Sequence, residues 1–213
     1  MTPERSQRLK TVAYRRQFNM TVILENVHDK HNIGAVMRSC DAVGIREIFV
    51  LYTEPDLQEE NLVLGKRTSA GTRKWVNVHY YRDAEACFGH VRRHYQQIWS
   101  THLGSDSVML HDMDLSASIA LLFGNEKDGV SQTALAYTDG NFVIPQMGMV
   151  RSLNISVACA VSLYEAYRQR QLKGMYEDNP TASLEQKEQL YQQYVDIHEA
   201  KRNGRTANKP EKS

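Results

Sequence analysis

The sequence predicts an α/β fold, with a mostly parallel sheet flanked by helices. Short runs such as TVILE (21–25), EIFVLY (47–52) and IALLF (119–123) are almost entirely apolar, as in strands that are buried on both faces. Segments with apolar residues at helical spacing lie between these runs, and the alternation of the two patterns is typical of α/β folds. The 213 residues suffice for one domain with terminal extensions.

Six strands are expected from short runs of apolar and β-branched residues that loop-forming residues separate. In chain order they span 21–25, 47–52, 76–80, 97–101, 119–123 and 142–144. An acidic loop over 54–60 and a segment rich in Gly, Ser and Thr over 65–72 join the second strand to the third. Strands without a polar face need cover on both sides, which the helices between them can provide.

Six helices are expected. The first begins at Thr2, with Pro3 at its first helical position, and Gly44 ends the second. In chain order the helices span 2–17, 32–43, 83–95, 131–137, 152–172 and about 184–200. Disorder is expected after Lys201. The chain therefore divides into a basic N-terminal helix (1–20), a central domain (21–172) and a C-terminal extension (173–213).

Basic residues are concentrated at the two ends of the chain. Residues 1–20 and residues 201–213 each carry five basic groups and one acid, so each end has a net charge of +4. The overall net charge is +1, which leaves −7 for residues 21–200. That stretch contains one internal basic group, formed by Lys66, Arg67, Arg73 and Lys74. Such charges either hold a polyanion or keep the chain ends solvated.

Several classes of protein are excluded by missing signals. The longest uncharged stretch, 152–164, has 13 residues, whereas a helix needs about 20 to span a bilayer. The N-terminus lacks the apolar core of a signal peptide, and the three cysteines are far apart, so a cytoplasmic protein with reduced thiols is expected. His90 and His94 lie four residues apart without a third ligand, so no metal site is expected.

Four segments are expected at the carboxyl ends of strands, where open α/β sheets bind ligands. They are HNIGAVMRSC (31–40), STHLG (100–104), GNEKDG (124–129) and IPQMGMVRSLN (144–154). The third is similar to half of a phosphate-binding loop, but Val130 stands where that loop needs Lys, so it could equally be a tight turn. The fourth suits an apolar ligand of the size of adenine. Arg38 is either a surface charge or a ligand of a phosphate or carboxylate.

The sequence resembles the SPOUT superfamily of methyltransferases, and most closely the TrmH (SpoU-type) tRNA 2′-O-ribose methyltransferases. Three motifs in register carry the resemblance: HNIGAVMRSCDAVG (31–44), LLFGNEKDGVS (121–131) and IPQMGMVRSLNISVACA (144–160). Two further segments are similar, so the resemblance covers about residues 8–176. It implies that the C-terminal part of the α/β sheet is threaded as a deep trefoil knot, which periodicity cannot reveal.

The resemblance implies S-adenosylmethionine as the cofactor, with its adenine bound by main-chain groups. The cofactor-binding residues that it assigns are Thr101, Leu103, Gly124, Ile144, Met149 and Leu153. It also implies a homodimer formed through the knot region and the helix over 152–172. That helix is apolar nearly all round, which independently predicts burial on several sides.

The implied reaction is transfer of the sulfonium methyl group to a ribose 2′-hydroxyl. The resemblance assigns this centre to Arg38, with Asn32, Glu126, Ser152 and Asn154 around it. A guanidinium has a pKa above about 12 and is a poor base. Our hypothesis is therefore that Arg38 grips a substrate phosphate and stabilises the developing negative charge. Glu126 and Asn154 would position groups, and Ser152 would orient Arg38.

The same resemblance implies that the basic residues contact RNA phosphates. The expected contacts are Arg8, Arg15, Arg16, Lys66, Arg67, Arg73 and Lys74. The expected substrate is tRNA, at guanosine 18 of the D-loop. Relatives that modify rRNA usually carry an extra N-terminal RNA-binding domain, whereas only one helix precedes the first strand here.

Two alternatives stay open. The first is a 23S rRNA 2′-O-ribose methyltransferase. The second, from another class, is a non-catalytic RNA-binding protein on the same fold, although the complete set of centre residues argues against it. A nucleotide-phosphate hydrolase is excluded because Val130 replaces the lysine that such a loop requires.

Overall fold

The computed structural model describes residues 1–54, 71–149, 152–177 and 179–206. Within these residues, seven strands form one sheet of parallel pairs, in the order β3-β2-β1-β6-β4-β7-β5. The strands are β1 (Met20–Glu25), β2 (Glu47–Leu51), β3 (Asn77–Tyr81), β4 (Gln97–Thr101), β5 (Val108–Met109), β6 (Ile119–Phe123) and β7 (Gly140–Val143). The expected parallel α/β fold is confirmed.

The centre of the sheet is formed by β1 with its neighbours β2 and β6. Every residue of these three strands is buried. Val22 of β1 lies in register with Ile48 on one side and with Leu121 on the other. Because both faces of these strands are covered, apolar side chains are required at successive positions, which explains the uninterrupted apolar runs of the sequence.

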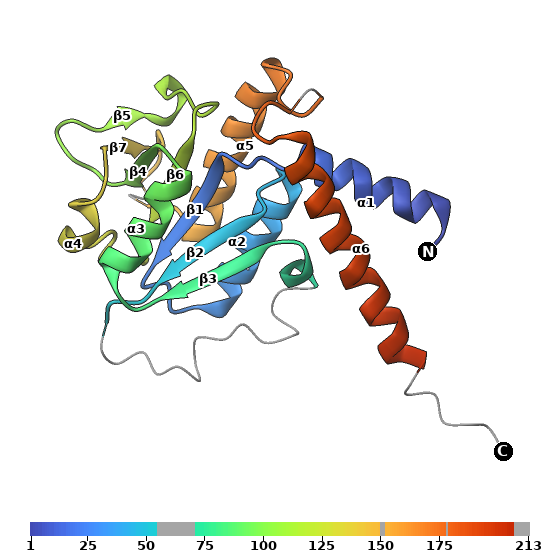
Figure 1. Cartoon of the computed structure of the whole chain (residues 1–213). Coiled ribbons are helices and arrows are strands. Elements are labelled where there is room, and N and C mark those ends of the chain that lie inside the picture. Colours follow the sequence, from blue (N-terminus) through green and yellow to red (C-terminus); the bar gives the residue numbers. More distant parts are fainter. Residues whose placement is uncertain (55–70, 150–151, 178, 207–213) are drawn as a thin grey trace.

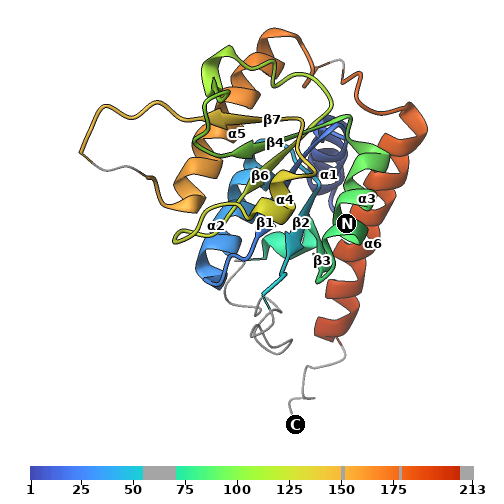
Figure 2. The same cartoon turned by 90° about the vertical axis from the view of Figure 1, so that its left-hand side faces the viewer.

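Helices cover both faces of the sheet (Figures 1 and 2). They are α1 (Pro3–Arg15), α2 (Lys30–Ala42), α3 (Ala84–His94), α4 (Gln132–Leu135), α5 (Ile155–Leu172) and α6 (Leu184–Thr206). On one face, Met37 of α2 and Leu163 of α5 belong to the same apolar cluster as the central strands. On the other face, Phe88 of α3 and Ala134 of α4 complete a second cluster. The sheet is therefore the middle layer of three.

The first and last helices, α1 and α6, pack against each other beside the sheet (Figure 1). Leu9 and Ala13 of α1 lie in one buried cluster with Leu190 and Tyr194 of α6. Two helices from opposite ends of the sequence thereby lie side by side.

Arg170 ties α5 to the amino ends of the central strands. Its side chain is fully buried, and its guanidinium donates to the carbonyl oxygens of Leu115 and Ala117 at 2.9 and 2.8 Å. It also donates to the side-chain oxygens of Gln17 and Asn19 at 3.0 and 2.6 Å. Burial lowers the pKa of Arg170 to about 10, so the group stays charged at neutral pH.

The structure departs from the sequence expectations at three places. Strand β5 was not expected, because two residues are too short to give a pattern. Helix α5 begins at Ile155 rather than at residue 152, because Asn154 caps it by accepting a hydrogen bond from the Ser156 N–H at 2.9 Å. Helix α6 continues to Thr206, so the prediction of disorder directly after Lys201 is wrong for the described residues.

Replacing Arg170 by Leu should destabilise the fold by about 3–5 kcal/mol, because four buried acceptors lose their donor. Urea unfolding measures the difference. Lys173→Leu is the matched control, because Lys173 and its partner Asp114 are both exposed, and it should change stability by less than about 1 kcal/mol. Equal effects of the two substitutions would contradict the structural role of Arg170.

Candidate active site at the carboxyl edge of the sheet

The topology creates a site at the carboxyl ends of the central strands. Strands β1, β2 and β3 follow one another from the middle of the sheet to one edge. The chain then crosses over, and the remaining strands form the other half of the sheet, in which β6 lies next to β1 and β4 next to β6. Ligands of open α/β sheets bind where the strand order reverses in this way. The four segments that the sequence singles out follow β1, β4, β6 and β7 along the chain, and the first of them lies in α2.

Three of these segments meet in a cluster of side chains, Asn32, Glu126 and Asn154. The Asn32 amide donates to Glu126 Oε1, and the Asn154 amide donates to the same oxygen at 3.3 Å and to Asn32 Oδ1 at 3.2 Å. Asn32 lies in the first turn of α2 and is 8% exposed, whereas Glu126 follows β6 and Asn154 is the cap of α5. One carboxylate thus joins two helices to the loop after β6.

A tight turn presents Glu126 to the two amides. Asn125 and Gly129 exchange both backbone hydrogen bonds, each at 3.1 Å, and Asn125 Oδ1 accepts from the Lys127 and Asp128 N–H groups. Gly129 has a φ of +71°, and a Cβ on Gly124 would lie 2.0 Å from the Gly129 carbonyl. Both glycines are therefore required by the turn itself.

Glu25 anchors the far end of this loop, and the sequence reasoning missed it. Its carboxylate is 1% exposed and accepts from the Ser131 N–H at 2.9 Å and from the Ser131 hydroxyl at 2.5 Å. The same hydroxyl accepts from the Ala134 N–H and so caps α4. The available signal was an acid that ends an otherwise apolar strand, because a buried carboxylate needs partners.

The expected cofactor residues follow or end three neighbouring strands, β6, β4 and β7. Thr101 is the last residue of β4, Gly124 directly follows the neighbouring strand β6, and Ile144 directly follows β7. Residues 145–149 form no hydrogen bond with the described residues, and this segment projects from the sheet (Figure 2). The apolar side chains of Leu103 and Met149 are 85% and 99% exposed, and Leu153 is 36% exposed.

Arg38 and Ser152 do not join the cluster in this structure. Arg38 is exposed on α2, and its guanidinium has no hydrogen-bond or ion-pair partner among the described residues. Ser152 is exposed at the start of the segment that leads into α5. The expected contact between the two is therefore not formed within the single chain.

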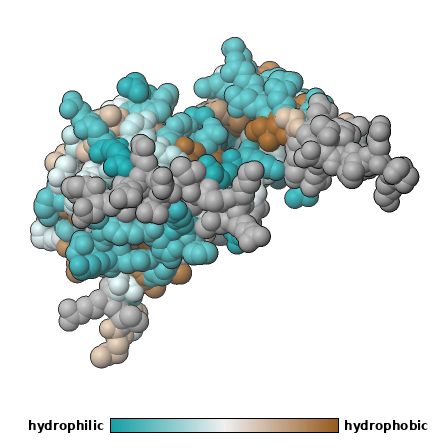
Figure 3. Space-filling model, turned by 90° about the horizontal axis from the view of Figure 1, so that it is seen from below, coloured by the Kyte–Doolittle hydropathy of each residue, from teal (hydrophilic) through white to brown (hydrophobic). Residues whose placement is uncertain are grey.

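The expected RNA contacts differ in how far the structure exposes them. Arg8, Arg15 and Arg73 are exposed, and Lys74 is half-buried. Lys66 and Arg67 lie outside the described residues. The surface seen from below is mainly hydrophilic, with hydrophobic residues in separate patches (Figure 3). An exposed basic side chain is a general requirement for contact with a polyanion.

The expectation for Arg16 is wrong. The side chain is 1% exposed and forms an ion pair with Asp41 at 2.5 Å. It also donates to the Tyr194 hydroxyl and to the Ile45 carbonyl, each at 2.9 Å. A guanidinium held in this way fastens α6 and α1 to the sheet domain and cannot reach an RNA phosphate.

The outer face of α5 carries an exposed apolar stripe. Val157, Val161 and Tyr164 of α5, with Leu153 just before the helix, follow one another at helical spacing and are 36–54% exposed, whereas the opposite face packs on α2. The expected burial of this helix on several sides is thus met on one side only within a single chain. Exposed apolar stripes of this kind mark interaction sites.

Fold and side-chain cluster together define an open α/β protein with a candidate ligand site at its topological switch point. Among the described residues there is no group of three metal-ligating side chains and no helix long and apolar enough to cross a membrane. The sequence model of the SpoU rRNA Methylase family matches residues 19–164. The chain belongs to this family.

The chain is similar to curated proteins over most of its length. It is 41% identical, over 91% of this chain and 95% of the relative, to the tRNA (guanosine(18)-2′-O)-methyltransferase of Thermus thermophilus. The enzyme of the same name from Escherichia coli is 38% identical over 90% of this chain and 82% of the relative.

Solved structures show the same fold. The A. aeolicus TrmH/SpoU tRNA modifying enzyme has a TM-score of 0.79 and 33% identity, over 92% of this chain and 96% of the other. The SpoU methyltransferase AviRb from Streptomyces viridochromogenes, in complex with AdoMet, has a TM-score of 0.63 and 26% identity, over 74% and 62% of the two chains.

Replacing Glu126 by Ala should lower the free energy of unfolding by about 1–3 kcal/mol, because the buried Asn32 amide loses its acceptor. Glu126→Gln keeps one acceptor oxygen and should lose less. The control is Asp128→Ala in the same loop, an exposed position that should stay within about 0.5 kcal/mol of the parent. Urea unfolding measures all three, and a Glu126→Ala protein as stable as the control would contradict the cluster.

Proposed function

We propose that this protein transfers the methyl group of S-adenosylmethionine to the ribose 2′-hydroxyl of guanosine 18 in tRNA. The observation that carries the proposal is the Asn32–Glu126–Asn154 cluster, which joins three separate motif segments at the switch point of the sheet. Relatives that match nine-tenths of the chain at 38–41% identity bear the name of this activity.

The residues at the carboxyl edge fit this cofactor. Adenine needs backbone donors and acceptors, and those of residues 145–149 have no partner among the described residues and lie beside exposed apolar side chains. The residues that would hold the cofactor are Thr101, Leu103, Gly124, Ile144, Met149 and Leu153. When bound, S-adenosylmethionine supplies an activated methyl group with a neutral thioether as its leaving group.

The chain itself contributes orientation and charge. The Glu126 cluster fixes the starts of α2 and α5 relative to the loop after β6, and thereby fixes the walls of the site. Arg38 is free to bind a phosphate of the substrate and to stabilise negative charge on the 2′-oxygen. Ser152 would orient Arg38 once the site is complete.

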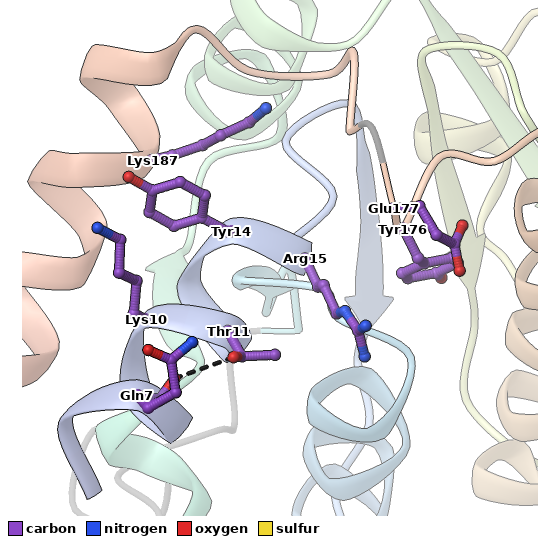
Figure 4. Close-up of a pocket in the computed structure, with 8 residues that line it drawn as sticks. All are labelled: Gln7, Lys10, Thr11, Tyr14, Arg15, Tyr176, Glu177 and Lys187. Atoms are coloured by element: carbon purple, nitrogen blue, oxygen red, sulfur yellow. Dashed lines mark hydrogen bonds between the residues drawn. The ribbon is translucent and has the colours of Figure 1, made fainter. Parts of the chain in front are cut away.

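The paired terminal helices offer a surface for RNA. An open pocket of about 380 Å³ lies between α1, α6 and the segment that follows α5 (Figure 4). Lys10, Arg15 and Lys187 line it, and Glu177 is the acid in its lining. Arg8 lies two helical turns from Arg15 on the same face of α1. Together with Arg73, Lys74 and the basic Lys66–Arg67 pair, these residues would contact RNA phosphates.

We also propose that the protein is a homodimer. The apolar stripe of α5 would bury against the same helix of a second copy, because a two-fold interface uses one patch twice. The knot expected for the SpoU fold would lie next to this interface and would shape the cofactor loops. Since tRNA is the proposed substrate, the cytoplasm is the proposed place of action.

Purified protein with labelled S-adenosylmethionine should methylate an unmodified tRNA transcript, and nucleotide mapping should place the label on the 2′-oxygen of guanosine 18. A transcript with 2′-deoxyguanosine at that position is the control, because it lacks only the acceptor oxygen. Transfer to 23S rRNA alone would replace the proposed substrate. No transfer to either RNA would favour a non-catalytic RNA-binding protein.

Replacing Arg38 by Lys should cut the rate of methyl transfer at saturating tRNA by at least about tenfold, because an ammonium cannot form the bidentate contact of a guanidinium. The affinity for S-adenosylmethionine should stay unchanged. Single-turnover transfer and equilibrium binding measure the two effects. Full activity of the Lys variant would refute the clamp.

A further inference from the structure

The loop over residues 102–107 joins β4 to β5 (Figure 1), and it contains Leu103, one of the residues expected to hold the cofactor. Thr101 at the end of β4 and Val108 at the start of β5 both lie in register with Phe142, on opposite sides of β7. Two strand spacings amount to about 10 Å, whereas six residues can reach about 20 Å. The ends of the loop therefore do not fix its path, and contacts within the loop have to do so.

One hydroxyl provides these contacts. Ser107 Oγ donates to the His102 carbonyl oxygen at 2.7 Å and accepts from the Gly104 N–H at 2.8 Å. The Ser107 N–H also donates to the Gly104 carbonyl oxygen at 3.4 Å. The half-buried Ser107 thereby holds the residues on both sides of Leu103.

The main chain of Leu103 is left unpaired by this arrangement. Its N–H and C=O form no hydrogen bond with the described residues, whereas the adjacent His102 C=O and Gly104 N–H are bound by Ser107. The Leu103 side chain is 85% exposed. The loop thus offers one main-chain donor and one main-chain acceptor beside an apolar side chain, a combination that suits the polar edge and apolar face of an adenine ring.

Two hydroxyls connect the base of this loop to the neighbouring strands of the site. Thr101 Oγ1 donates to the Leu122 carbonyl oxygen at 3.3 Å, two residues before Gly124. On the other side, Ser100 Oγ donates to Asn141 Oδ1 of β7 at 2.5 Å. The loop is therefore fixed between the two strands that lead to the other expected cofactor segments.

We propose that Ser107 is a positioning residue of the cofactor site, whose hydroxyl holds the loop over residues 102–107 in the shape that presents the main chain of Leu103 to the adenine of S-adenosylmethionine; this rests on the proposed function. A loop that is ordered before the ligand arrives binds more tightly, because less conformational entropy is lost on binding. In this role Ser107 does not act on the reacting atoms. Its loss should weaken cofactor binding without slowing the transfer itself.

The test is equilibrium binding of S-adenosylmethionine and of S-adenosylhomocysteine, which share the adenine, to the full-length protein. Ser107→Ala should weaken the binding of both by about tenfold, because one hydroxyl forms two of the bonds that shape the loop. Ser107→Thr keeps the hydroxyl and should stay within about threefold of the parent. The matched control is Ser105→Ala, because the exposed Ser105 hydroxyl binds none of the described residues. Equal affinities of Ser107→Ala and the control would overturn the proposal.

Single-turnover methyl transfer separates a positioning role from a role in the chemical step. With tRNA and S-adenosylmethionine both saturating, Ser107→Ala should transfer the methyl group within about twofold of the parent rate. A slower saturated rate at unchanged cofactor affinity would overturn the positioning role.

Hydrogen exchange measures the clamp in the free protein. The Gly104 amide should exchange at least about tenfold faster in Ser107→Ala than in the parent, whereas Ser105→Ala should leave it unchanged. An unchanged Gly104 amide in Ser107→Ala would overturn the proposal and leave the proposed function standing. If the Gly104 amide responds as expected but the parent protein binds no S-adenosylmethionine, the proposed function fails, and the role of Ser107 toward that cofactor fails with it.

Discussion

A single carboxylate holds the site together. Glu126 receives amide donors from the start of α2 and from the cap of α5, so that two helices and the loop after β6 share one anchor. The fold makes this possible, because parallel strands end at the same edge and deliver their loops to one place. The Asn125–Gly129 turn and the Glu25–Ser131 pair fix the two ends of the loop that carries Glu126.

Two buried arginines far from this edge link helices to the sheet. Arg170 ties the far end of α5 to the amino ends of the strands, and Arg16 fastens the paired terminal helices to the sheet domain. Both arginines are buried, so they act as structural cross-links rather than as ligands for a polyanion. In the proposed function, the exposed cations of α1 are among those that would contact RNA phosphates.

Sequence patterns predicted the sheet because burial on both faces leaves a run of apolar residues, as in IALLF (119–123). They also predicted Asn32, Glu126 and Asn154, since recognisable motifs contain all three. Arg16 was misjudged because its burial depends on α6, which lies far along the chain and leaves no local pattern. Glu25 was missed for the same reason, because it acts through a partner from another loop.

The central claim is that the carboxyl edge ordered by Glu126 is the cofactor site, and hydrogen exchange with and without S-adenosylmethionine tests it most directly. The amides of residues 146–149 have no partner among the described residues and should exchange fast in the free protein. Bound cofactor should slow exchange there and in the loops after β4 and β6, and should leave α1 and α6 unchanged. Protection confined to α1 and α6, or none at all, would contradict the account.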